Sequence, residues 1–457
     1  MTPVVESVFG TDPWWIITIK VLGMFVFLLV FTIFNVWFER RVVAKMQQRK
    51  GPIMNGPLGL AQALADGTKA LLKEDFRPTG ADKVIFNLAP ILTGTAAFTA
   101  WSVMPLGGEV SMFGVTTQLQ LTDLPMGVLF ILSIASVGIY GIVLAGWAST
   151  SEYALVGSIR STAQMISYEI AMGLSLVAVF MYAGSMSTSE IVGVQAQPWG
   201  VLPSLEFPSW FGILLLPSFI IYVISMVAET NRAPFDLVEC EQELVSGYLT
   251  DYSGFRYAIY FLAEYINMAT VSGVATTLFL GGYKAPWPIA PWVSEYLGWT
   301  WIDTGWMGPV WFLAKVMCFM FLFVWLRGTL PRLRYDQFMH LGWKVLIPIN
   351  LVWIVAVAVA RVGANEGWFT RPVLLGAAGV VLVVLVIIAL LPTKKEEIRS
   401  EVSRVPAVED GVYDPFEYGY PVPPMPGQVL PEDADVLVGP DGEVVDSDLI
   451  VDQDKEV

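Results

Sequence analysis

Residues 228–265 have the sequence AETNRAPFDLVECEQELVSGYLTDYSGFRYAIYFLAEY, which concentrates acidic side chains between two strongly apolar segments. Like charges held close together beside a lipid bilayer repel one another and are costly to ionise. The stretch therefore needs a structural or functional explanation. Its carboxylates are Glu229, Asp236, Glu239, Glu241, Glu243, Asp251 and Glu264, and its basic side chains are Arg232 and Arg256.

The composition of the whole chain is that of a membrane protein. Of its 457 residues 55% are hydrophobic and 15% are charged, whereas soluble proteins carry about 25% charged residues. The net charge is −15, but residues 392–457 hold 17 of the 41 acids and 5 of the 26 bases. The rest of the chain is nearly neutral, so the net charge does not identify a partner, and no nucleic acid is expected to bind.

Nine apolar segments are each close to the length that a helix needs to cross a hydrocarbon core of about 30 Å. We predict an all-α polytopic membrane protein with about nine transmembrane helices. Residues 1–391 would form the membrane domain, and residues 392–457 an acidic cytoplasmic tail containing proline and aromatic residues. The predicted helices lie at about 14–38, 84–104, 126–148, 166–183, 210–227, 257–279, 309–326, 343–360 and 373–391.

Lysine and arginine are distributed unequally between the two sides of the predicted membrane domain. One side carries 21 of them and the other carries 3. Because cytoplasmic loops are enriched in basic residues, the amino terminus is predicted outside. The loops 39–83 and 228–256 and the tail are then cytoplasmic, and the membrane is the cell inner (plasma) membrane.

The loop 39–83 is too long for a simple turn. Between Leu60 and Leu72 apolar residues recur at helical spacing, with Gln62, Asp66 and Lys69 on the opposite face. This pattern predicts an amphipathic helix, which either lies flat in the membrane interface or packs against a soluble partner.

Glu169 and Glu264 fall inside predicted spans or near their ends, and Glu39 ends the first span. An ionisable group at the bilayer centre costs about 2.5–3.5 kcal/mol on insertion scales, so such groups usually face a cavity or a proton path. A structural ion pair is the alternative explanation.

Pro234 is predicted at an early helix position, where its missing N–H costs nothing. A helix continuing from it would place Asp236, Glu239 and Glu243 on one side and turn Glu241 away. Carboxyls so close in a poorly hydrated place would share protons and titrate as a coupled set. The alternative is a solvated acidic loop.

The chain contains two cysteines, Cys240 and Cys318, and one histidine, His340. These residues cannot supply four ligands to a zinc or iron–sulfur site by themselves. The sequence also contains no nucleotide fingerprint or nucleophile triad. We therefore expect no metal, no nucleotide and no independent catalytic centre in this chain.

The order of several motifs resembles a known family. AETNRAPFDLVECEQELVSGY, preceded by ERRVVAKMQQRKGP and LLKEDFRP and followed by RGTLPRLRYDQFMHLGWKVLIP, is similar to the H-subunit family of proton-translocating NADH:quinone oxidoreductase, respiratory complex I. The mitochondrial counterpart is the NADH dehydrogenase subunit 1 family. The likeness covers about residues 14–391. A membrane subunit of an energy-converting hydrogenase is the nearest alternative, and a stand-alone secondary transporter is suggested by composition only.

The resemblance implies a membrane subunit that forms the membrane side of a quinone-binding chamber and couples quinone reduction to proton translocation. The quinone would be ubiquinone or menaquinone, and its electrons would come from iron–sulfur clusters in partner subunits. The partners would be other membrane and hydrophilic subunits of the complex, together with membrane lipid. By motif match, the chamber acids are Glu39, Asp66 and Glu74, the charged loop contains Glu229, Arg232, Asp236, Glu239, Glu241, Glu243 and Asp251, and the buried acids leading into the membrane are Glu169 and Glu264.

Overall fold

The computed structural model describes residues 12–196, 198–202, 205–236, 246–286 and 305–366, with residues 437–438 and 444–445 in addition. Within these residues the protein is an all-α membrane protein, with seven helical segments long and apolar enough to cross a bilayer. They are α1 (Trp14–Met46), α3 (Lys83–Ala100) with η2 (Trp101–Val103), α4 (Gly127–Ala148), α5 (Glu152–Ala183), α10 (Gly254–Phe279), α12 (Met307–Thr329), and the continuous run of α13 (Tyr335–His340), η5 (Leu341–Leu346) and α14 (Ile347–Asn365).

Shorter helices and three hairpins connect or follow these spans. The short helices are η1 (Pro57–Gly59), α2 (Gln62–Leu72), α6 (Thr188–Gln195), α7 (Phe211–Leu214), α8 (Leu216–Glu229) and η3 (Gly247–Leu249). The antiparallel hairpins pair β1 (Glu109–Met112) with β2 (Val115–Gln118), β3 (Pro198–Leu202) with β4 (Leu205–Pro208), and β5 (Leu437–Val438) with β6 (Val444–Val445). The chain divides into two units, residues 1–375 and 376–457, and only β5 and β6 are described in the second.

Local sequence signals explain where several helices begin and end. The Asp82 carboxylate accepts hydrogen bonds from the backbone N–H groups of Val84 and Ile85 at the start of α3, which satisfies two otherwise unpaired donors. At the end of α5, Gly184 adopts a left-handed conformation with φ 75°, which glycine does without steric cost. Pro217 lies in the first turn of α8, where its missing N–H is tolerated.

The predicted span at 210–227 is broken in the structure. The chain leaves helical geometry at Leu215, with φ −110° and ψ 44°, so α7 and α8 are separate and α8 has only 14 residues. Proline cannot donate the hydrogen bond that would continue α7. The predicted loop 149–165 is also wrong, because α5 already begins at Glu152. The predicted span at 373–391 and the tail from residue 392 lie outside the described residues, apart from β5 and β6.

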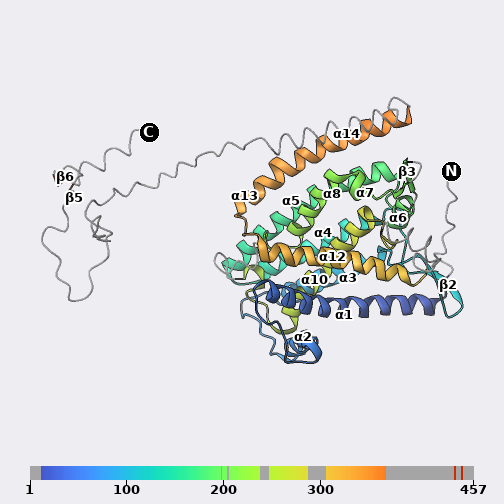
Figure 1. Ribbon diagram of the computed structural model, residues 1–457. Coiled ribbons are helices and arrows are strands. Elements are labelled where there is room, and N and C mark those ends of the chain that lie inside the picture. Colours follow the sequence, from blue (N-terminus) through green and yellow to red (C-terminus); the bar gives the residue numbers. More distant parts are fainter. Residues whose placement is uncertain are drawn as a thin grey trace. The chain divides into compact units, whose positions relative to one another are not determined.

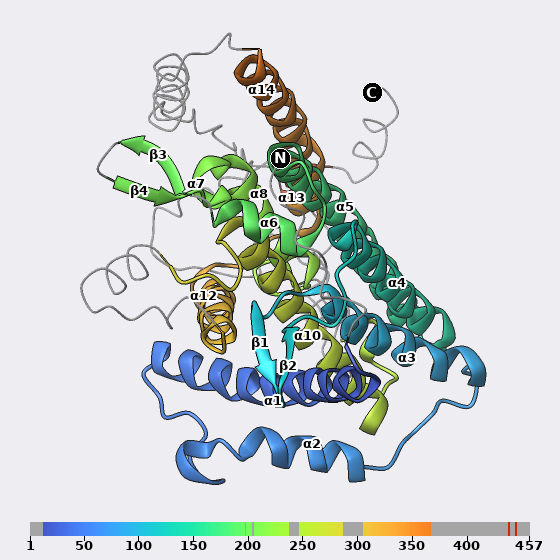
Figure 2. The ribbon, with the colours of Figure 1, turned by 90° about the vertical axis from the view of Figure 1, so that its right-hand side faces the viewer.

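The helix α10 occupies the centre of the bundle and is the most deeply buried span. It contacts α3, α8, α12 and α1, and the large core around it includes Trp101, Tyr222, Phe279 and Phe312. Figure 1 shows α1 along one edge of the helices and α14 along the opposite edge, and Figure 2 shows α2 beside α1 on the side away from α5 and α14.

The helix predicted in the loop 39–83 is present as α2, which covers residues Gln62–Leu72.

Small residues allow α3 and α4 to approach closely. A Cβ atom placed on Gly141 of α4 would lie 2.8 Å from the carbonyl oxygen of Ala89 and 3.0 Å from the backbone nitrogen of Thr93. Both atoms belong to the backbone of α3, so they could move only by displacing that helix. Close backbone approach at small residues is a main source of helix association in membranes.

We expect Gly141→Ala to destabilise the α3–α4 contact by about 1–3 kcal/mol, which is typical of overpacking, and to lower the thermal stability of the purified protein. The matched control is Gly173→Ala on α5, where an added Cβ meets no atom within 4 Å and alanine favours the helix. Thermal unfolding of both variants in the same detergent measures the difference. Equal melting temperatures would show that α3 and α4 do not need this close approach.

Candidate functional site

Glu39 is a buried carboxylate near the end of α1. Its side chain accepts hydrogen bonds from the Tyr265 hydroxyl of α10 and from the Arg327 guanidinium of α12. The residue is 7% exposed, so these partners replace the water that would otherwise solvate its charge. Three spans therefore meet at this one carboxylate.

Arg232 links Glu39 to a second carboxylate. Its Nη1 lies 3.5 Å from Glu39 Oε1, and its Nε lies 2.8 Å from Glu264 Oε1. The guanidinium also stacks 4.5 Å from the centre of the Tyr265 ring, a favourable arrangement for a cation. Arg232 is 5% exposed. A buried charge of this kind is stable only when opposite charges surround it.

The turn that carries Arg232 is held at both ends by one side chain. The Gln164 amide of α5 donates to the carbonyl oxygens of Ala228 and Phe235, at 2.8 Å each. Pro234 lies in this turn and not in a helix, so the prediction of an early helix position for Pro234 is wrong. The helix predicted beyond it falls within residues 237–245, which lie outside the described residues.

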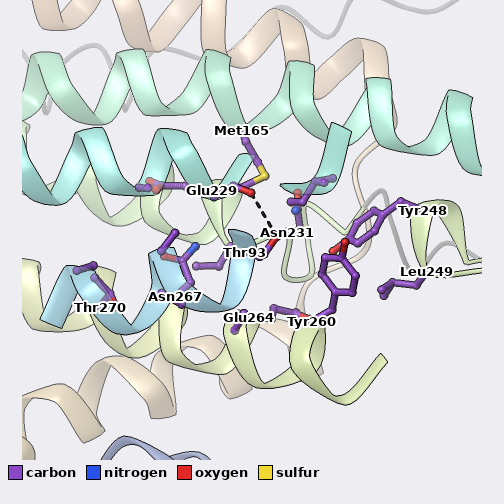
Figure 3. A pocket seen from close by; sticks show the side chains of 18 residues that line it. Thr93, Met165, Glu229, Asn231, Tyr248, Leu249, Tyr260, Glu264, Asn267 and Thr270 are labelled. Carbon is purple, nitrogen blue, oxygen red and sulfur yellow. Dashed lines mark hydrogen bonds between the residues drawn. The ribbon is translucent and has the colours of Figure 1, made fainter. Parts of the chain in front are cut away.

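A cavity opens between α3, α4, α8 and α10. It lies beside the charge cluster that is formed by Glu39, Arg232, Glu264, Tyr265 and Arg327. It has about 70 Å³ of space that water can occupy, which is enough for several ordered water molecules. Figure 3 shows Glu229, Asn231, Glu264 and Asn267 around it. Glu229 is 2% exposed, and its Oε2 has no hydrogen-bond partner among the described residues. A buried polar atom beside a cavity that other polar side chains also reach is a typical binding position for water.

A second, smaller cavity shares part of its wall with the first. Glu229 lines both, and the second is also lined by Ala135 of α4 and Met172 of α5. These two residues neighbour the contact in which the Ser136 hydroxyl donates to Glu169. Glu169 is partly buried. It belongs to the same region of the bundle as Glu229, but it does not line either cavity.

Two further predicted acids, Asp66 and Glu74, lie in the segment that connects α1 to α3. Asp66 is on α2, where it forms an ion pair with Arg40 of α1 and accepts a 3.1 Å hydrogen bond from Gln62. Both partners of the ion pair are substantially exposed. Glu74 follows α2 and is exposed. Neither residue lines the cavity at Glu229.

Two of the remaining predicted residues, Asp236 and Asp251, lie on the turn that carries Arg232 and just before α10, respectively. Asp236 is 6% exposed, and its Oδ2 lies 3.6 Å from Arg332 Nη2. Asp251 is partly buried, and its Oδ2 has no hydrogen-bond partner among the described residues. Three predicted residues lie outside the described residues, namely Glu239, Glu241 and Glu243.

Two residues of the cluster, Arg327 and Tyr265, were not predicted from the sequence. Arg327 contributed only to the count of cytoplasmic basic residues, although its position at the end of an apolar span signals a charge near the membrane. Tyr265 directly follows Glu264, but nothing in the sequence distinguishes it from the aromatic residues around it. The cavity residues Asn231 and Asn267 were missed in the same way, because neither is ionisable.

The arrangement is suited to holding and passing protons. Carboxylates, hydroxyls and amides surround space for water, and chains of such groups inside membranes serve as proton relays. In the described part of the chain, no three His, Cys, Asp or Glu side chains are grouped so that they could hold a metal ion.

Comparison with known proteins identifies the family. A family model described as NADH dehydrogenase matches residues 19–358. The H subunit of the NADH-quinone oxidoreductase of Cutibacterium acnes is 57% identical over 421 residues, covering 92% of this chain and 93% of the relative. The protein of the same description from Streptomyces avermitilis is 50% identical over 428 residues, covering 93% and 90%. The one from Frankia alni is 55% identical over 385 residues, covering 84% and 81%.

The matched regions cover most of this chain and most of each relative, so the similarity does not depend on a single motif. They confirm the resemblance that was inferred from the order of the motifs. The chain therefore belongs to the H-subunit family of NADH-quinone oxidoreductase, respiratory complex I.

Proposed function

We propose that this chain forms the membrane side of the quinone-binding chamber and couples quinone reduction to proton translocation through its buried carboxylates. The observation that carries the proposal is that Glu229 and Glu264 line one cavity with room for several water molecules, while Arg232 joins Glu264 to Glu39. Family membership supports a quinone as the substrate, since the relatives are named as quinone oxidoreductase subunits.

Reduction of a quinone to a quinol consumes two electrons and two protons. Negative charge that develops on the headgroup increases the proton affinity of carboxylates close to it. In the proposed mechanism, Glu39 and Asp66 lie toward the chamber and respond first to this charge. Arg232 then shifts its pairing between Glu39 and Glu264, and protons redistribute through the water of the cavity to Glu229.

The other proposed residues extend this chain of charges at both ends. Glu169 continues it beyond the second cavity, toward α4 and α5. Asp236 and Asp251 continue it toward the cytoplasmic side, and Glu74 adjoins the chamber. Glu239, Glu241 and Glu243 are proposed on motif match alone.

The electrons are proposed to come from an iron–sulfur cluster held by a partner subunit, with no nucleotide bound by this chain. The proposed partners are the membrane and hydrophilic subunits that border the quinone site, and lipid. We propose the inner (plasma) membrane as the location, with the amino terminus outside. Residues 1–391 would be the membrane domain, and residues 392–457 a cytoplasmic tail.

The proposal predicts that Glu264→Gln lowers both NADH:quinone reductase activity and proton pumping in the assembled complex. The amide keeps the shape of the side chain but can neither hold a negative charge nor give up a proton at neutral pH, so the cavity loses a proton carrier and Arg232 loses a partner. Loss of a proton-transferring group typically costs about 10²-fold or more in rate. Both rates are measured in proteoliposomes with a short-chain quinone.

The control is Glu152→Gln, an exposed glutamate at the start of α5, which is expected to keep wild-type rates. If Glu264→Gln, Glu229→Gln and Glu239→Gln all supported coupled quinone reduction at wild-type levels, the proposed proton path would be wrong.

A further inference from the structure

The β1–β2 hairpin carries a phenylalanine at a position where the backbone disfavours it. Met112 pairs with Val115, so Phe113 and Gly114 form a two-residue turn. Their φ angles are 50° and 85°, as a type I′ turn requires, and such turns strongly prefer Asn-Gly. A bulky residue at positive φ is strained, and Phe113 is also 82% exposed. Neither the geometry of the turn nor packing in the core explains why a phenylalanine occupies this position.

The base of the hairpin is fixed to the beginning of α1. The Thr117 hydroxyl of β2 donates to Asp12 Oδ2 at 2.7 Å, and Lys20 Nζ of α1 lies 2.7 Å from the same oxygen. Lys20 also donates to the carbonyl oxygen of Gln120 at 3.5 Å. The side chains of Asp12 and Lys20 are 10% and 8% exposed, so water competes little with this contact. The hairpin therefore has a defined position beside α1.

The tip of the hairpin lies level with the first turn of α1. The Phe113 ring meets the Trp15 ring edge to face, with 6.2 Å between the centroids. Trp14, the first residue of α1, is 79% exposed. Tryptophan and tyrosine are enriched at the level where a membrane span meets water. Phe113 thus joins two tryptophans at this level.

Polar and apolar parts of this region are separated as a bilayer interface would require. The outward strand positions carry Glu109, Ser111 and Thr116, which are exposed and polar, whereas the tip is aromatic. From the tip, exposed apolar side chains continue along α1, a span whose surface is mostly not covered by the rest of the chain. They include Ile17, Val21, Leu22 and Phe25. The tip is therefore continuous with the exposed apolar surface of α1.

We propose that the β1–β2 hairpin anchors this end of α1 in the bilayer, with Phe113 inserted among lipid chains just below the headgroups. The proposed occupant is lipid rather than a protein subunit, because the aromatic tip continues the exposed apolar surface of a helix long enough to span the bilayer. Burial of the ring in lipid offsets the backbone strain, since apolar surface removed from water is stabilising.

Spin labelling of the assembled complex in nanodiscs of phosphatidylcholine and phosphatidylglycerol tests this proposal. Cys240 and Cys318 are first replaced by serine, and the label is attached through Phe113→Cys or, as the control, Thr116→Cys. A label in lipid is relaxed by oxygen and protected from a water-soluble nickel chelate. We expect that pattern at position 113 and the opposite pattern at position 116.

Access of the nickel chelate to position 113 would place the tip in water and overturn the proposal. Protection from both oxygen and the chelate would also overturn it, because the tip would then be covered by protein. A second variant, Phe113→Asn, creates the preferred Asn-Gly turn and so preserves the hairpin. It should increase the mobility of a label at position 116, whereas Phe113→Trp should leave that mobility unchanged. Equal mobility in Phe113→Asn and the parent would show that the ring does not anchor the hairpin.

Discussion

Replacement of Arg232 by methionine is expected to prevent stable assembly of the protein. Arg232 lies 2.8 Å from Glu264 and 3.5 Å from Glu39, and methionine would leave the buried Glu39 and the partly buried Glu264 with less positive charge nearby. Breaking a buried ion pair by removing one partner costs about 3–5 kcal/mol. Glu39 keeps its contact with Arg327 in this variant. The yield of assembled complex and its thermal unfolding measure the effect.

The control for this variant is Arg361→Met. Arg361 also stacks on a tyrosine ring, with its guanidinium 5.2 Å from the centre of Tyr182, but it is exposed. A cation over an exposed ring contributes only about 0.5–1 kcal/mol. If Arg232→Met and Arg361→Met assembled equally well, the pairing of Arg232 with two acids would not stabilise the bundle.

Glu229→Gln is also expected to have a large effect, and this effect is on rate rather than on assembly. Glutamine fills the same volume, and Glu229 Oε2 has no hydrogen-bond partner among the described residues, so little structure should be lost. The variant can no longer release a proton into either of the cavities that it lines. Proton pumping should fall by about 10²-fold, the usual minimum for loss of a proton-transfer group. Pumping in proteoliposomes is compared at equal amounts of assembled complex.

Ser225→Ala is a matched control on the same helix. Ser225 lies one turn before Glu229, is fully buried, and has an Oγ atom without a hydrogen-bond partner among the described residues. Its substitution removes a polar atom but no titratable group, so pumping should remain at the wild-type rate. Wild-type pumping by Glu229→Gln would remove Glu229 from the proton path, and a defect in Ser225→Ala would point to packing instead.

Hydrophobic length predicted most of the fold within the described residues. Seven of the predicted spans correspond to long apolar helices, because a run of about 20 apolar residues has few alternatives to a transmembrane helix. Hydropathy does not detect a backbone break such as the one at Leu215, since the residues on both sides remain apolar. It also missed the beginning of α5, where polar residues such as Ser158 and Ser161 are buried by neighbouring helices rather than exposed in a loop. The strands of the hairpins are too short to show the regular alternation of polar and apolar residues that would identify them in the sequence.

The candidate site was predicted less completely. Ionisable residues inside spans were visible in the sequence, and Glu39, Glu229, Arg232 and Glu264 do come together in the structure. Their partners were not predictable, because contacts such as that of Glu39 with Arg327 join residues 288 positions apart. Periodicity also failed at Pro234, where the turn closed by Gln164 overrides the local preference for a helix start.

The hydrogen bonds of Gln164 restrain the turn around Arg232, which is far from Gln164 in the sequence. The side-chain amide of Gln164 donates hydrogen bonds to the backbone on both sides of Arg232 and so closes the turn. The acidic segment after Asp236 thus starts from an anchored point. Any movement of Phe235 would first have to break its hydrogen bond with the Gln164 amide, which ties this turn to α5.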